Sequence, residues 1–91
     1  MKILGIEHIG IAVKDLDTSS PFWSHILNLQ HKGKETVQDQ GVLTDIYDTT
    51  QGKVELLQSL GEDTPIGKFL LKKGPGVHHV CFEVDDINKA I

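Results

Sequence analysis

Histidines recur at one position of a repeated segment in this 91-residue chain. The run EHIGIAVKDL at residues 7–16 returns as HHVCFEVDDI at residues 78–87, so that His8 and His79 occupy matching places near the start of two alternating patterns. Imidazole is the commonest metal-ligating side chain, so a histidine repeated at one strand position points to a metal site. The alternative is a duplicated packing position, with both histidines partly buried at strand ends.

Alternating apolar residues predict the strands that must position these side chains. Residues 5–13 predict a first strand that carries His8 on its small, polar face. An extended polar stretch is predicted from Gly33 to Gln38, and further strands over residues 42–48 and 53–60. In the strand over residues 53–60, Glu55 lies on a face that is otherwise apolar, so it is a candidate functional carboxylate.

Capping residues and prolines predict two helices. For the first, Asp15 or residues 17–20 are expected to supply the cap and Pro21 to lie where the helix begins. Its apolar face, made of Phe22, Ile26 and Leu29, is expected to cover the sheet. The second is expected to begin at residues 64–65 and to end at the Gly-Pro-Gly segment 74–76.

We therefore predict an α+β fold in a single domain over residues 1–91. A strand–helix–three-strand module (βαβββ) runs to about residue 60, a linker helix covers about 61–76, and a second module starts at about 77–91. Because that second module is only begun, the sequence looks truncated, and we expect the natural chain to continue past Ile91. The alternative is a half-molecule that completes itself by dimerisation.

Composition excludes several classes of partner. A formal net charge of −4, with no run of lysines, gives no basis for nucleic-acid or membrane binding. The single cysteine, Cys81, cannot form an internal disulfide, and no segment is apolar and long enough for a signal peptide or a membrane span, so a cytoplasmic location is expected. The small core of so short a chain favours a homodimer.

Three segments taken in order resemble the methylmalonyl-CoA epimerases of the vicinal-oxygen-chelate (glyoxalase/bleomycin resistance/dioxygenase) superfamily. The first is the pair of repeated strand motifs described above. The second is VELLQSLGEDTPI at residues 54–66, and the third is GVHHVCFEVD at residues 76–85. The resemblance covers nearly the whole chain. It implies two βαβββ modules that form a cupped sheet around one divalent metal, with His8, Glu55 and His79 as ligands and a fourth ligand, a glutamate, beyond the end of this sequence.

The resemblance also implies an activity. It is the epimerisation of methylmalonyl-CoA or a similar acyl-CoA, in which a proton is abstracted to give a metal-stabilised enolate. Two imidazoles and a carboxylate suit cobalt, zinc, nickel, manganese or magnesium. Two alternatives stay open: a lactoylglutathione lyase of the glyoxalase I type, and a metal-free small-molecule binding or resistance protein. Outside this context, Glu55 would be read as an exposed residue of a half-solvated strand.

Epimerisation needs an acid/base group on each face of the reacting carbon. A glutamate that serves this role in related enzymes aligns near Thr44, so the adjacent Asp45 is a catalytic candidate, and Glu83 is a second one at the mouth of the cleft. The main acid/base group is expected beyond Ile91. The chain as given is therefore expected to bind metal with little or no turnover.

The remaining histidines are expected to be structural. By strand alternation, His78 points to the face opposite His79. His25 and His31 lie on or after the first helix and are expected at the surface.

Overall fold

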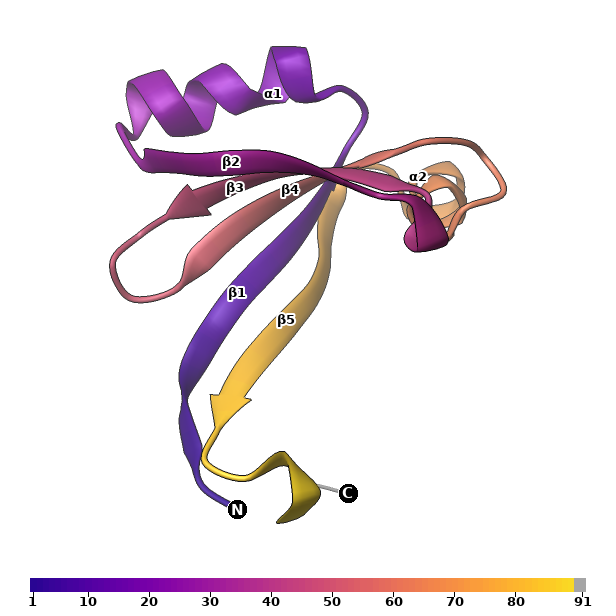
Figure 1. Cartoon of the computed structure of the whole chain (residues 1–91). Coiled ribbons are helices and arrows are strands. Elements are labelled where there is room, and N and C mark those ends of the chain that lie inside the picture. The colour runs from indigo at the N-terminus through magenta and orange to yellow at the C-terminus, as the bar shows by residue number, and fades with distance from the viewer. Residues whose placement is uncertain (90–91) are drawn as a thin grey trace.

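A mixed five-stranded sheet with one helix on each face organises the molecule (Figure 1). We analysed a computed structural model, which describes residues 1–89. In chain order the elements are β1 (Ile3–Val13), α1 (Leu16–Pro21), the π-helical turn η1 (Phe22–Ile26), β2 (Gln30–Val37), the 3-10 turn η2 (Gln38–Gln40), β3 (Val42–Asp48), β4 (Lys53–Ser59), α2 (Pro65–Lys73), β5 (Gly76–Val84) and the 3-10 turn η3 (Ile87–Lys89). Within this described part, every helix is too short or too polar to cross a membrane.

The strand order is β2-β3-β4-β1-β5. Strands β2, β3 and β4 form an antiparallel meander, whereas β4 lies parallel to β1 and β5 pairs antiparallel with the other edge of β1. The first four strands and α1 are thus one βαβββ module, and β5 repeats the role of β1. This arrangement confirms the predicted α+β fold and the module.

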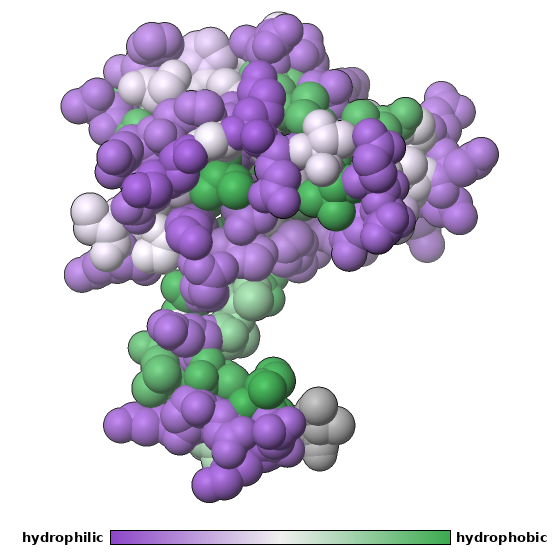
Figure 2. All heavy atoms as spheres, in the orientation of Figure 1, coloured by the Kyte–Doolittle hydropathy of each residue, from purple (hydrophilic) through white to green (hydrophobic). Residues whose placement is uncertain are grey.

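Strands β1 and β5 continue beyond the rest of the sheet as a two-stranded arm, with the N-terminus and the turn η3 near its tip (Figure 1). Apolar side chains gather on this arm and stand out in the space-filling view (Figure 2). The exposed ones are Ile3, Leu4, Ile6, Val80 and Phe82. We call these five residues the arm patch.

Strand alternation divides the core between the two faces of the sheet. On one face, α1 and η1 cover a cluster of buried residues, which are Val13, Leu16, Tyr47 and Leu56. On the other face, α2 covers a second cluster, made of Ala12, Val42, Leu57 and Ile66. Consecutive residues such as Leu56 and Leu57 therefore belong to clusters on opposite faces of the sheet.

Helix α2 begins and ends where the sequence predicts. The Thr64 hydroxyl accepts a hydrogen bond from the Gly67 amide at 3.0 Å, and Pro65 occupies the first turn, where its missing N–H costs nothing. Gly74 ends the helix with a φ of 78°, a conformation that glycine adopts without strain.

The first helix differs from the prediction. It begins at Leu16 instead of Pro21, because the Asp15 carboxylate caps it by accepting from the Asp17 amide at 3.0 Å. A π-helical turn then rotates the following side chains, which leaves Phe22 and Ile26 exposed at 49% and 71%. The packing against the sheet comes from Leu16, Trp23 and Leu29.

Candidate metal centre

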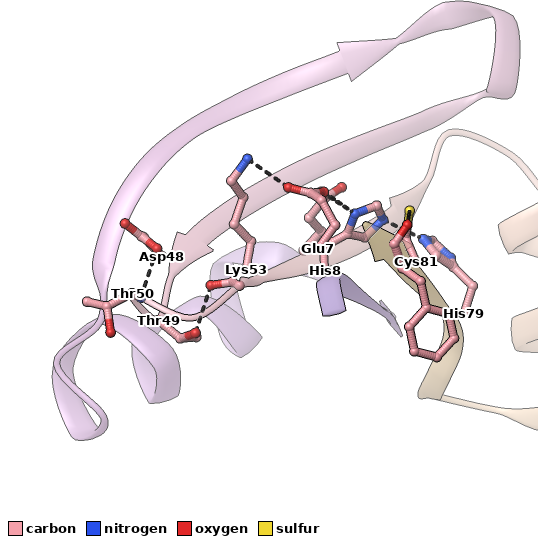
Figure 3. Close-up of polar contacts among 11 residues, drawn as sticks. Glu7, His8, Asp48, Thr49, Thr50, Lys53, His79 and Cys81 are labelled. Carbon is pink, nitrogen blue, oxygen red and sulfur yellow. Dashed lines mark hydrogen bonds and ion pairs between the residues drawn. The ribbon is translucent and has the colours of Figure 1, made fainter. Parts of the chain in front are cut away.

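His8 and His79 meet across the β1–β5 ladder (Figure 3). His8 pairs with Cys81 and Gly10 pairs with His79, so both imidazoles project from the same face of the sheet. The ring of His79 lies over Gly10, where a side chain would occupy its place. The Nε2 atoms of the two histidines come within 3.0 Å of one another, with the rings perpendicular.

This geometry fits a shared divalent ion. Two imidazole nitrogens bound about 2.1 Å from one ion, at right angles to each other, stand about 3.0 Å apart. The Nε2–Nε2 distance of 3.0 Å is close to that separation, and it is also the distance of a hydrogen bond between the two rings. Two imidazoles beside a carboxylate are also a donor set that borderline divalent metals accept.

Glu55 supplies the carboxylate. Strand β4 runs parallel to β1 and places Glu55 beside Gly10 in register, so its side chain shares the histidine face. Its Oε2 atom lies 3.4 Å from Nδ1 of His8. His8 therefore lies between the other two predicted ligands, with His79 at its Nε2 atom and Glu55 on its Nδ1 side. His79 and Glu55 each approach His8, but the group whose ligand atoms all lie within 4.8 Å of one another does not include His79.

Glu7 joins this group, although the sequence reasoning missed it. Its Oε1 atom lies 2.7 Å from Nδ1 of His8, and its Oε2 atom lies 3.2 Å from Nζ of Lys53 (Figure 3). Glu7, His8 and Glu55 offer ligand atoms within 4.8 Å of one another. The hydrogen bond with His8, and then that with Lys53, holds the pKa of the Glu7 carboxyl below its usual value, so Glu7 is ionised near neutral pH.

His78 also lies beside the centre, so the prediction that it points away from His79 is wrong. Its Nδ1 atom lies 2.9 Å from Nδ1 of His79. The ring of Phe69, on α2, packs edge-on against His78 with centroids 5.0 Å apart. The register of β5 shifts at this point, because Gly10 pairs with His79 while the next residue of β1 pairs with Val77. The extra residue breaks the alternation on which the prediction rested.

The environment of His79 keeps its ring neutral. Burial lowers its pKa, and the neighbouring His8 and His78 lower it further, while Glu55 acts in the opposite direction. A neutral imidazole has a lone pair to offer, so this ring is ready to ligate at ordinary pH.

A cavity of about 280 Å³ opens on this face between the sheet and α2. Its polar lining includes His8, Glu55, His78 and His79. Its apolar lining consists of Val37, Val42, Leu57, Pro65 and Ile66. Polar groups at one end of an apolar cleft are the usual form of a small-molecule site.

Comparison with known proteins places this chain in a family. A sequence profile of the Glyoxalase/Bleomycin resistance protein/Dioxygenase superfamily matches residues 7–91. The chain belongs to this superfamily. The assignment agrees with the resemblance seen in the strand repeat and with the βαβββ module of the fold.

Within the superfamily, the chain is similar to acyl-CoA epimerases. It is 40% identical to human mitochondrial methylmalonyl-CoA epimerase over 94% of this chain and 49% of that protein. It is 37% identical to ethylmalonyl-CoA/methylmalonyl-CoA epimerase of Cereibacter sphaeroides, over 90% of this chain and 62% of that protein. A variant of Streptomyces coelicolor methylmalonyl-CoA epimerase, solved with 2-nitronate-propionyl-CoA, superposes with a TM-score of 0.86 and 32% identity, over 98% and 68% of the two chains. The chain thus spans about half the length of the human relative.

The structure does not bring Asp45 to the His8–His79 pair. Asp45 is 2% exposed and lies on the α1 face of β3, whereas the adjacent Thr44 lines the cavity. Its carboxylate accepts hydrogen bonds from Ser20, from His31 and, at 3.0 Å, from the Tyr47 hydroxyl. Burial raises its pKa, but these hydrogen bonds outweigh burial and leave the pKa below its usual value. Such a position suits a structural carboxylate, and His31, expected at the surface, is tied to it.

Glu83 also lies apart from the histidines. It pairs with Gly5 on the arm and lines a separate cavity of about 520 Å³, together with Glu7 and Lys53. The exposed carboxylate of Glu83 is therefore on the far side of Glu7 from the candidate centre. An acid/base role for it stays a prediction.

Proposed function

We propose that this chain is part of a metal-dependent epimerase that acts on methylmalonyl-CoA or a similar acyl-CoA. The observation that carries the proposal is the pair of Nε2 atoms 3.0 Å apart in the lining of a largely apolar cavity, with Glu55 3.4 Å from Nδ1 of His8. The relatives named as acyl-CoA epimerases support the choice of reaction and substrate. The metal, its identity and the ligand roles of His8, Glu55 and His79 belong to the proposal.

The residues around the cavity have distinct parts in such a reaction. His8, Glu55 and His79 would hold the ion, which when bound supplies Lewis-acid stabilisation of the negative charge that develops as the carbon acid loses its proton. The apolar lining, including Val42 and Leu57, excludes water and so strengthens the electrostatic interactions at that end.

The proposal predicts exchange of a substrate proton in deuterated water. The complete enzyme of which this chain is proposed to be part, loaded with cobalt or zinc, is expected to exchange the proton on the carbon between the thioester and the carboxylate of methylmalonyl-CoA. NMR follows the exchange. His79→Ala is expected to lose both exchange and stoichiometric metal binding, whereas His25→Ala, at an exposed position of η1, keeps both. Exchange by the metal-free protein would contradict metal dependence. Turnover of a glutathione hemithioacetal instead would favour the lyase alternative.

We also propose that the protein is a homodimer that covers the arm patch. Strand β5 is the last strand of the sheet, so its outer edge carries backbone groups without a strand partner among residues 1–89. Phe82, in the arm patch, is 55% exposed. A contiguous apolar surface beside an open strand edge favours association with a second copy.

Light scattering can test this association. The protein is expected to have the mass of two chains, and Phe82→Glu is expected to reduce it to one, because a charge in the arm patch cannot be buried without a partner. Leu71→Glu, a matched change at an exposed position of α2, is expected to leave the mass unchanged. A monomeric wild-type protein would rule the proposal out. The cytoplasmic location stays a prediction.

A further inference from the structure

Each candidate ligand histidine lies next to a residue that the β1–β5 ladder leaves without a partner. On β1 the pairs are Ile6 with Phe82 and His8 with Cys81, so Glu7 is the extra residue. On β5 the extra residue is His78, between the partners of Gly10 and Ile11. These are β-bulges, which turn a side chain away from the direction that strict alternation would give it.

Both bulges place a hydrogen-bonding group against the same atom type. Glu7 contacts Nδ1 of His8 at 2.7 Å, and His78 contacts Nδ1 of His79 at 2.9 Å. The two Nε2 atoms face one another at 3.0 Å, which is the distance of an N–H···N hydrogen bond. In the metal-free protein one of them therefore carries a proton, which an ion would displace. A neutral imidazole carries its single proton on one nitrogen and a lone pair on the other, and the partner of one nitrogen decides which.

We propose that Glu7 and His78 are positioning residues, which accept the Nδ1 protons of His8 and His79 and so present both Nε2 lone pairs to one ion. This inference rests on the proposed metal function and adds to it the residues that orient the ligands. An outer group on the second nitrogen fixes the ring and raises the basicity of the ligand.

The surroundings of Glu7 favour an orienting role over a direct one. Its two oxygens are both engaged, one by His8 and the other by Lys53 at 3.2 Å. Glu55 lies farther from the same nitrogen, at 3.4 Å, which is beyond the usual range for an N–H···O hydrogen bond. Since Glu7 takes the Nδ1 proton, the carboxylate of Glu55 is left available for the ion.

His78 is held in turn by α2. The edge-on contact with Phe69 fixes its ring beside the cavity. For His79 to donate from Nδ1, His78 must accept at its own Nδ1 and carry its proton on Nε2. The packing of α2 on the sheet is thus connected through two rings to the Nε2 atom of His79.

The test separates the acceptor from the charge. Glu7→Leu removes the acceptor, whereas Glu7→Gln keeps an oxygen in the same place. In the metal-free protein, ¹⁵N NMR of the imidazoles is expected to report a proton on Nδ1 of His8 in the wild type and in Glu7→Gln, and a shift of that proton toward Nε2 in Glu7→Leu. Zinc affinity, measured by competition with a chromophoric chelator, is expected to fall about 10- to 100-fold in Glu7→Leu and in His78→Phe.

A control variant tests whether loss of a negative charge alone changes the tautomer or the affinity. Glu35→Leu, at an exposed position of β2, removes the same charge and is expected to change neither tautomer nor affinity. A wild-type protein that binds no zinc would contradict the proposed metal function. The tautomer measurement would still decide whether Glu7 positions the ring of His8. A Glu7→Leu protein with the wild-type tautomer and affinity would overturn the inference. So would a Glu7→Gln protein that, like His79→Ala, binds no zinc, because Glu7 would then be a ligand.

Discussion

Replacing Asp45 by alanine is expected to lower the free energy of unfolding by about 3 kcal/mol, because the change removes the shared acceptor of a buried hydrogen-bond network. The donors left behind are the hydroxyls of Ser20 and Tyr47 and the ring of His31. Tyr47 is 2% exposed, so water cannot replace the lost partner there. In a domain of this size the loss corresponds to a fall of about 12 to 24 °C in Tm.

Urea denaturation followed by circular dichroism measures the effect. Asp45→Asn keeps one acceptor oxygen but loses the charge, and is expected to fall between the wild type and Asp45→Ala. Asp63→Ala, at an exposed turn position, is the matched control and is expected to stay within about 0.5 kcal/mol of the wild type. Equal stability of Asp45→Ala and Asp63→Ala would contradict a structural role for the network.

The same network predicts how stability depends on pH. The hydrogen bonds to Asp45 in the folded protein hold its pKa below that of an aspartate in the unfolded chain. The stabilisation is therefore complete above the unfolded pKa and is lost as pH falls through the lower, folded pKa. Asp45→Asn has no such proton to bind. The difference in unfolding free energy between wild type and Asp45→Asn is therefore expected to be constant near neutral pH and to shrink below about pH 4.

The strands and the shared face of the ligands could be predicted from the sequence, because both follow from local alternation. The period of two in residues 5–13 and 53–60 places His8 and Glu55 on faces that the sheet then brings together. The repeat supplied His79 by analogy with His8. These inferences need no knowledge of which strands pair.

The bulges could not be predicted in this way. Whether Glu7 or His78 is the extra residue depends on the pairing of two strands that are far apart in sequence, and each shift changes the face of one side chain. The doublet of His78 and His79 is visible in the sequence, but alternation sends its members apart. Only the ladder between β1 and β5 reverses that conclusion.

Asp45 illustrates a second limit. It is adjacent to Thr44, and one step along a strand decides whether a carboxylate faces a cavity or a helix. Its partner His31 stands opposite Tyr47 in the register of β2 and β3, so the cluster forms only once those strands pair. The early start of α1 also matters, because it brings Ser20 within reach of Asp45.

Gly10 has no room for a side chain, because the ring of His79 lies over it. A Cβ atom built there would lie 2.2 Å from Cε1, 2.6 Å from Nε2 and 2.7 Å from Nδ1 of His79. All three distances are shorter than carbon and nitrogen atoms tolerate, so the imidazole cannot keep its place above an alanine. Gly10 therefore permits the approach of His79 to His8. Glycine is required here because the imidazole ring fills the place of a side chain, and the backbone conformation of Gly10 does not itself require glycine.

Gly10→Ala is accordingly expected to weaken zinc binding by about 100-fold or more, exceeding the loss from an outer-shell change, because it displaces a ligand itself. The fold is expected to persist, since the ring can turn into the cavity and alanine restricts the unfolded chain more than glycine does. Chelator competition measures the affinity and urea denaturation the stability. Gly61→Ala, where an added Cβ meets nothing within 4 Å, is the control and is expected to match the wild type in both. Wild-type affinity in Gly10→Ala would mean that His79 does not lie over β1 when it binds metal.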